Sequence, residues 1–218
     1  MPGLRIYNNV YSINAQNSLG RNTQNMGSSL EKLSTGLRVN KAADDAAALM
    51  ISTSLRADIA SMQQAIRNTT DGMSLLNVAE GAIATSQSML VRMRELAIES
   101  STATLGSAQR ASINQEFTAL KTEMDRISLT AEFNGQKLLD GSLRTGAATT
   151  LNVQVGIQSD ANSRINLNAA VDLTNLDTTA LGLSTLDIKT ADASLSALDS
   201  IDSAIDTITA ARGNIGAV

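Results

Sequence analysis

The longest apolar pattern in this chain repeats at heptad spacing after residue 50. Its members follow alternating steps of four and three residues: Leu55, Ile59, Met62, Ile66, Thr69, Met73 and Leu76. Such steps place side chains along one stripe of an α-helix that packs against other helices. The stripe then shifts by one residue and continues through Ala79, Ile83, Leu90, Met93 and Ala97. The pattern predicts one helix from Lys41 to about Ser100, about 90 Å long at the rise of an α-helix.

The first 35 residues carry two shorter apolar stripes on a polar background. One consists of Ile6, Val10 and Ile13, and the other of Met26, Leu30 and Leu33. Gly20 and Gly27 interrupt the segment, and each glycine costs up to about 1 kcal/mol inside a helix. Because isolated helices are marginal, we expect this helix to form when partners cover its stripes. Gly36 is its predicted stop, and Asn40 is the predicted N-cap of the long helix.

A shorter helix and a β-rich segment follow the long helix. The segment from about Ser107 to Ser128 carries apolar residues at helical spacing: Ile113, Phe117, Leu120, Met124 and Ile127. Its short connector predicts that it lies antiparallel to the long helix. Asn134-Gly135 and Asp140-Gly141 are turn signals. Beyond them two groups alternate with polar residues, which predicts a small β-hairpin: Leu151, Val153 and Val155, then Ile165 and Leu167.

Helical spacing returns near the end of the chain. From about Ala191 to Val218 the apolar positions are Leu195, Leu198, Ile201, Ile205, Ile208 and Ile215. The fold prediction is therefore mainly α: a long antiparallel helical rod, a three-helix bundle or coiled coil, with a small β-hairpin region. We expect an assembly segment and linker at residues 1–40. A rod domain at residues 41–218 contains the β-rich insert at about 130–190.

The stripes of the first segment have no obvious partner inside the chain. An ordinary intramolecular bundle accounts for the seam residues of the longer helices. The first segment is different, and we predict that its apolar residues pack against other copies of the protein. These candidate self-assembly residues are Ile6, Val10, Ile13, Met26, Leu30 and Leu33.

Composition narrows the possible functions. The chain has 43% hydrophobic residues but 2% aromatic residues, so its core must consist of many aliphatic contacts, as in helices packed along their length. It has no Cys and no His, which excludes disulfides, thiol nucleophiles and Ser/His/Asp triads. The net charge of −4 argues against nucleic-acid binding. No stretch is apolar enough to span a membrane, and the start lacks the layout of a cleaved secretory signal.

Paired carboxylates are the remaining candidates for chemistry, and they favour a solvated surface. Glu95 and Glu99 share one helix face, as do Asp199, Asp202 and Asp206, and these faces are otherwise polar. No phosphate-binding or metal-binding motif is present. The sequence therefore predicts no enzyme activity, no cofactor and no metal. Between Val91 and Glu99 the charges are densest, and helical spacing puts Arg92, Glu95, Leu96 and Glu99 on one exposed, ion-paired side.

Three motifs, in order, resemble those of bacterial flagellins. They are Leu33 to Ala47 (LSTGLRVNKAADDAA), Val91 to Ala97 (VRMRELA) and Phe133 to Gly141 (FNGQKLLDG). The likeness covers residues 4 to 140 and resumes from Ser194 to Val218. It implies a secreted filament subunit for motility, exported without a cleaved signal through the flagellar type III apparatus. It also implies contact with the innate-immune Toll-like receptor 5 through Arg92, Leu96 and Glu116.

The resemblance leaves expectations and alternatives open. Flagellins continue beyond the region of Arg212, so we expect this chain to be shortened, to polymerise poorly alone and to have a partly disordered first helix. A hook–filament junction protein shares the terminal helices and is the nearest alternative. A helical signalling or adaptor rod is an alternative of another class, although the β-rich stretch interrupts the heptads that it needs. A carbohydrate-active enzyme with paired carboxylates is the third.

Overall fold

The computed structural model describes residues 9–218, so Ile6 of the predicted stripes lies outside the described residues. The chain divides into two compact units, up to Ala60 and from Ser61 onward. The first unit holds helix α1 (Val10–Thr35) and the beginning of helix α2 (Ala46–Ser101). The second holds the rest of α2, helix α3 (Ser107–Thr130), two small sheets, the one-turn helix α4 (Leu167–Val171) and helix α5 (Ala191–Gly216).

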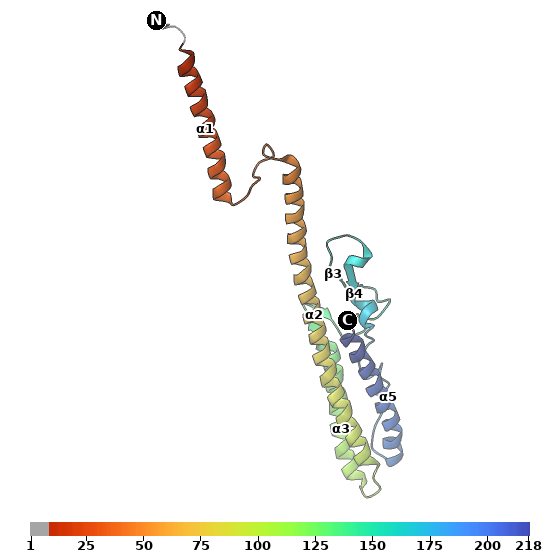
Figure 1. Ribbon diagram of the computed structural model, residues 1–218. Coiled ribbons are helices and arrows are strands. Elements are labelled where there is room, and N and C mark those ends of the chain that lie inside the picture. The colour runs from red at the N-terminus through yellow and green to blue at the C-terminus, as the bar shows by residue number, and fades with distance from the viewer. Residues whose placement is uncertain (1–8) are drawn as a thin grey trace, which may run out of the picture. The chain divides into compact units, whose positions relative to one another are not determined.

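Three helices form the core of the second unit. Figure 1 shows α3 and α5 beside the later half of α2. Arg94 of α2 pairs with Asp202 of α5, while Arg212 farther along α5 pairs with Glu80 earlier on α2. Because the numbers rise on one helix as they fall on the other, α5 runs antiparallel to α2. The predicted mainly helical fold with long packed helices is confirmed.

Helix α5 packs through a small-and-large heptad. Its buried positions step by three and four residues: Ser194, Ala197, Ile201, Ala204, Ile208, Ala211 and Ile215. Alternating Ala with Ile lets the helix lie close to its neighbours. Leu195 was predicted as part of this stripe, but its side chain is 55% exposed, so that prediction is wrong. The buried face of α5 consists mainly of Ala and Ile, so the positions of its leucines do not locate that face.

The start of α2 differs from the prediction. The helix begins at Ala46 rather than Lys41, and its first turn is capped by Asp45, whose Oδ1 accepts a hydrogen bond from the Ala48 amide at 2.9 Å. Asn40, the predicted cap, lies earlier in a turn whose amides bond Asp44 instead. Gly36 ends α1 with φ 67°, a left-handed conformation that glycine adopts without strain, so the predicted stop is confirmed.

The predicted β-hairpin is confirmed. Strand β3 (Asn152–Gln154) pairs antiparallel with β4 (Arg164–Asn166), with Val153 opposite Ile165. A shorter pair joins β1 (Glu132–Phe133) to β2 (Gln136–Lys137). The β3 strand sits on α2 at Gly72: a Cβ there would lie 3.2 Å from a Val153 methyl group. Asn68, one turn earlier, donates a hydrogen bond to the Gln154 carbonyl at 3.1 Å.

Much of the remaining core comes from a segment with little regular structure. Its fully or almost fully buried side chains are Leu138, Leu139, Leu143, Leu173, Leu176, Leu183 and Ile188. Residues 171–190 have neither helical nor strand periodicity in the sequence. They fold as an irregular strap between α4 and α5 whose leucines complete the core. Among the described residues, no helix is long and apolar enough to cross a membrane.

Candidate assembly surface

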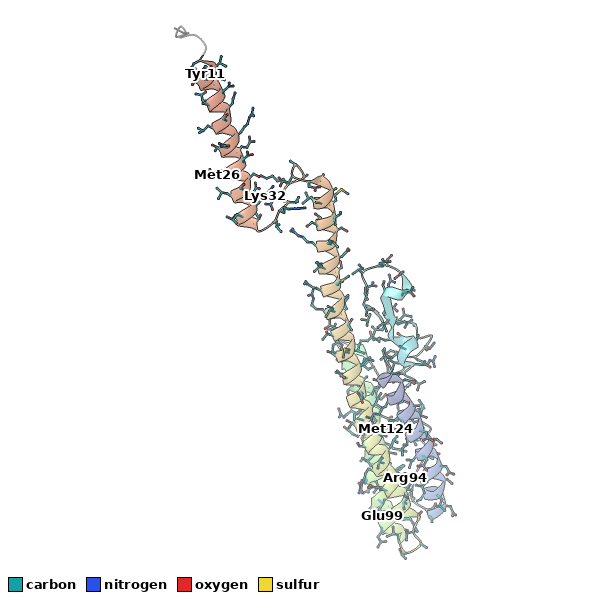
Figure 2. All side chains as sticks on the ribbon, in the orientation of Figure 1. Tyr11, Met26, Lys32, Arg94, Glu99 and Met124 are labelled. Carbon is teal, nitrogen blue, oxygen red and sulfur yellow. The ribbon has the colours of Figure 1, made fainter. Side chains whose placement is uncertain are left out.

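Helix α1 is fully formed, yet none of its residues is buried. The Asn9 side chain caps it by accepting a hydrogen bond from the Ser12 amide at 3.2 Å. Its described candidate residues, Val10, Ile13, Met26, Leu30 and Leu33, are all at least 50% exposed. Figure 2 shows Met26 projecting from the side of this helix. A helix that exposes every apolar side chain has its whole packing surface free for a partner.

The apolar residues of α1 lie on two opposite faces. Met26 follows Val10 by 16 positions, which at about 100° per residue places it about 160° around the helix. Leu19, which is 71% exposed, lies with Met26, Leu30 and Leu33 at heptad steps of seven, four and three. Leu19 was not among the predicted assembly residues, although this spacing identifies it. One face therefore suits a coiled-coil partner and the other, with Val10 and Ile13, a second contact.

The turn after α1 is held by charged side chains. Asp44 accepts hydrogen bonds from the amides of Asn40 and Lys41, both at 3.2 Å, and these bonds hold the pKa of its carboxyl below the ordinary value. The Lys41 ammonium lies 2.7 Å from the Glu31 carboxylate, a hydrogen bond that raises the lysine pKa. Asn40 also donates to the Thr35 hydroxyl at 2.7 Å. The end of α1 and residues 36–45 therefore form one hydrogen-bonded corner.

The first half of α2 leaves its heptad stripe open. Five members of this α2 stripe are more than half exposed: Leu55, Ile59, Met62, Ile66 and Met73. The continuation through Ala79, Ile83, Leu90, Met93 and Ala97 is buried under α3 and α5. Along this one helix, the apolar stripe is thus covered by packing partners at one end and uncovered at the other. The open half is the second candidate assembly surface.

The predicted receptor-contact residues differ in their exposure to solvent. Arg92 donates to Glu116 of α3 at 2.8 Å and to Glu95 at 3.0 Å, and the side chains of Arg92 and Glu116 are each about half exposed. These carboxylates raise the pKa of the arginine above its ordinary value. Leu96 is only 1% exposed, so its interpretation as part of the exposed side is wrong. Leu96 packs inward because α3 and α5 together cover more of the α2 surface than a single heptad stripe.

The described residues offer little for chemistry. They hold no group of three or more acidic side chains placed to bind a metal ion. Two of the carboxylates considered in the sequence pair with arginines instead, Glu95 with Arg92 and Asp202 with Arg94. Long helices with a closed core at one end and open apolar stripes elsewhere define the class of helical structural subunits that complete their packing in an assembly.

Comparison with known proteins gives this class its family. Residues 6–144 match the model of the bacterial flagellin N-terminal helical region. Flagellin of Halalkalibacterium halodurans is 40% identical over 215 residues, which cover 98% of this chain and 75% of the relative. Flagellin of Bacillus subtilis is 39% identical over 203 residues, which cover 91% of this chain and 64% of the relative. The chain belongs to the bacterial flagellin family.

Solved structures agree with this assignment. The crystal structure of Bacillus cereus flagellin has a TM-score of 0.57 and 30% identity, covering 69% of this chain and 81% of that protein. A putative flagellar hook-associated protein from Vibrio parahaemolyticus has a TM-score of 0.62 at 16% identity, which shows a shared fold alone. The predicted filament subunit is therefore confirmed: the chain is a structural subunit of the bacterial flagellar filament, an extracellular appendage.

Proposed function

We propose that this chain enters the filament by burying the two open surfaces described above, the apolar faces of α1 and the α2 stripe. The single observation that supports this most is the contrast along α2: five stripe members before Leu76 are more than half exposed, and the members from Ala79 onward are buried. Contiguous exposed apolar surface on a folded helix marks a contact site. The functional boundary that we propose lies at about residue 40, because α1 supplies surface without contributing to the core.

An assembly assay with matched leucine variants tests this proposal. The chain is joined to the C-terminal remainder of the Halalkalibacterium halodurans flagellin, and filaments are counted by electron microscopy. Leu30→Gln with Leu33→Gln should abolish elongation while the unfolding midpoint stays unchanged, since neither side chain is buried. Leu129→Gln is the control, because Leu129 is 62% exposed but lies outside both surfaces. Normal filaments from the α1 double variant would contradict the proposal.

Two finer roles extend the family assignment. The chain is exported through the flagellar type III apparatus, a role supported by its membership of the flagellin family. It also presents Arg92 and Glu116 to Toll-like receptor 5, supported by the half-exposed ion pair that joins them at 2.8 Å. The buried Leu96 supports that surface from below.

Receptor activation in reporter cells tests the second role. Arg92→Ala and Glu116→Ala should each reduce signalling, with helicity by circular dichroism unchanged because exposed ion pairs contribute little stability. Arg126→Ala is the matched control, since Arg126 is also an exposed arginine on the rod, paired with Glu123 at 2.6 Å. Unaltered signalling from both test variants would rule out this contact.

A further inference from the structure

The sequence contains a single Asn-Gly pair, and the structure places it at the tip of the β1–β2 hairpin. Asn134 and Gly135 alone connect the two strands, whose register pairs Phe133 with Gln136. Both connecting residues have positive φ, 50° for Asn134 and 78° for Gly135. A two-residue type I′ turn requires positive φ at both positions, and Asn-Gly is its preferred sequence. These two residues therefore set the register of the hairpin.

The same two residues carry the groups that react when an asparagine deamidates. The nucleophile is the backbone nitrogen of Gly135, and no side chain obstructs it: a Cβ at Gly135 would meet nothing within 4 Å. The electrophile is the side-chain amide carbon of Asn134. Both residues are exposed, and neither the Asn134 amide nor the Gly135 N–H has a hydrogen-bond partner among the described residues. The two reacting groups are thus adjacent and accessible to water.

Two Asp-Gly pairs, which can form the same cyclic intermediate, are held more firmly. Asp71-Gly72 lies inside α2, where the helical backbone fixes both residues. In Asp140-Gly141, the carboxylate accepts a hydrogen bond from the Ser142 amide at 2.9 Å. Of these three pairs, the Asn-Gly pair at the hairpin tip is the one without either restraint. Asparagine is also among the thermally labile residue types.

We propose that Asn134 is a modification site that deamidates without an enzyme, and that its isoaspartate product loosens the β1–β2 hairpin. The Gly135 nitrogen attacks the side-chain carbonyl carbon of Asn134. The bond from that carbon to the amide nitrogen breaks, and ammonia leaves with the proton that Gly135 has lost. A cyclic succinimide remains. Water opens it at the side-chain carbonyl to give aspartate, or at the main-chain carbonyl to give isoaspartate. Nothing is oxidised or reduced, and water is the only co-reactant.

The isoaspartate product changes the backbone of the turn. Its peptide bond runs through the side chain and adds a methylene group to the main chain, so a two-residue type I′ turn no longer fits. The intact turn aligns the Leu138 amide with the Ala131 carbonyl at 3.1 Å and the Lys137 ammonium with the Leu129 carbonyl at 2.7 Å. Leu138 is fully buried, so a lost register loosens the core at this end of α3.

Peptide mapping of the full chain during incubation gives the first test, and it needs no assembly. Deamidation should appear first at Asn134, and faster at mildly alkaline than at neutral pH, because the attacking nitrogen must lose its proton. Protein isoaspartyl methyltransferase should label the same peptide. Asn162, which is exposed and precedes Ser163, is the matched control and should react far more slowly. Loss at Asn162 as fast as at Asn134 would overturn the proposal. So would an intact Asn134 in the folded chain while a synthetic peptide of residues 129–140 deamidates.

Two variants test the effect on the hairpin. Asn134→Gly keeps a sequence that suits a type I′ turn but has no amide to lose, so its thermal midpoint should not change with incubation. Asn134→Asp carries the aspartate product, which also suits this turn, so the fresh variant should match the fresh wild type. The aged wild type should have a lower midpoint than both, with faster amide exchange at residues 136–138.

The remaining outcomes are equally decisive. If Asn134→Gly loses stability with age as the wild type does, the change comes from another site and the proposal fails. If aged wild type contains isoaspartate at Asn134 but exchanges its amides at residues 136–138 as before, the loosening of the hairpin is ruled out. Neither result depends on the assembly surfaces proposed above, so the proposed function is tested separately.

Discussion

Lys121 shows how one side chain holds a segment that has no regular structure. Its ammonium donates to three carbonyl oxygens of the strap, those of Leu183, Ser184 and Leu186, at 3.2, 2.9 and 2.9 Å. Partial burial lowers the pKa of this lysine. Asp125, one turn along α3, accepts bonds from the amide and the hydroxyl of Thr178 at 2.8 and 2.9 Å. Polar side chains of helix α3 therefore hold the strap in place through hydrogen bonds.

Removing this ammonium should loosen the strap. Lys121→Met keeps the apolar stem but leaves three carbonyls without their donor, so we expect a loss of about 1 to 3 kcal/mol in the free energy of unfolding. Urea denaturation measures the loss, and amide exchange should rise first at residues 183–188. Lys189→Met is the control, because Lys189 is an exposed lysine of the same strap. Equal stability of the two variants would show that the hydrogen bonds of Lys121 to the strap do not stabilise the protein.

Asp44 makes the corner after α1 sensitive to acid. Backbone hydrogen bonds lower its pKa in the folded protein, so between the folded and unfolded values the folded state binds fewer protons. Its contribution is present above the unfolded pKa of about 3.9 and is lost as the pH falls through the lowered folded value. We expect the amides of Asn40 and Lys41 to lose exchange protection only as the pH falls through this lowered pKa of Asp44. Asp44→Asn should show that loss already at neutral pH, and persistent protection in this variant would contradict the assignment.

At the scale of elements, periodicity predicted the helices and the hairpin, but it did not predict the strap. The heptads of α2 and α3 were visible because every third or fourth residue was apolar, as with Phe117 and Met124. The strap was not visible in the sequence, because its leucines reach the core through irregular turns. The backbone of these turns is hydrogen-bonded to Asn114, Lys121 and Asp125 of α3, a helix far away in the sequence. Such long-range polar contacts leave no local period. The burial of Leu96 was missed for a related reason: a second covering helix cannot be seen in a single stripe.

Two glycines within α2 give a matched test at this scale. Gly81 has open space where a Cβ would stand, so Gly81→Ala should stabilise the protein by about 0.5 to 1 kcal/mol through helix propensity alone. Gly72 faces Val153 of the hairpin at 3.2 Å, so the same substitution must displace the hairpin. We expect Gly72→Ala to gain less, or to destabilise, in thermal unfolding. An equal gain at both positions would mean that the hairpin does not rest on Gly72.

At the scale of the whole molecule, stability should be distributed unevenly between the two units. Among the described residues, the unit from Ser61 onward contains all the buried side chains, and α1 contains none. Helical hydrogen bonds without tertiary packing open by local fluctuation, because a short helix is marginal in water.

Hydrogen exchange of the free subunit should therefore show a gradient along the chain. We expect α1 amides to exchange within the dead time of manual mixing, the first turns of α2 next, and the α5 seam around Ile201 and Ile208 only on global unfolding. In filaments the order should change, with α1 becoming protected as its two faces are buried. Protection of α1 in the free subunit equal to that of α5 would mean that its stripes are already covered, and assembly would then lack its driving surface.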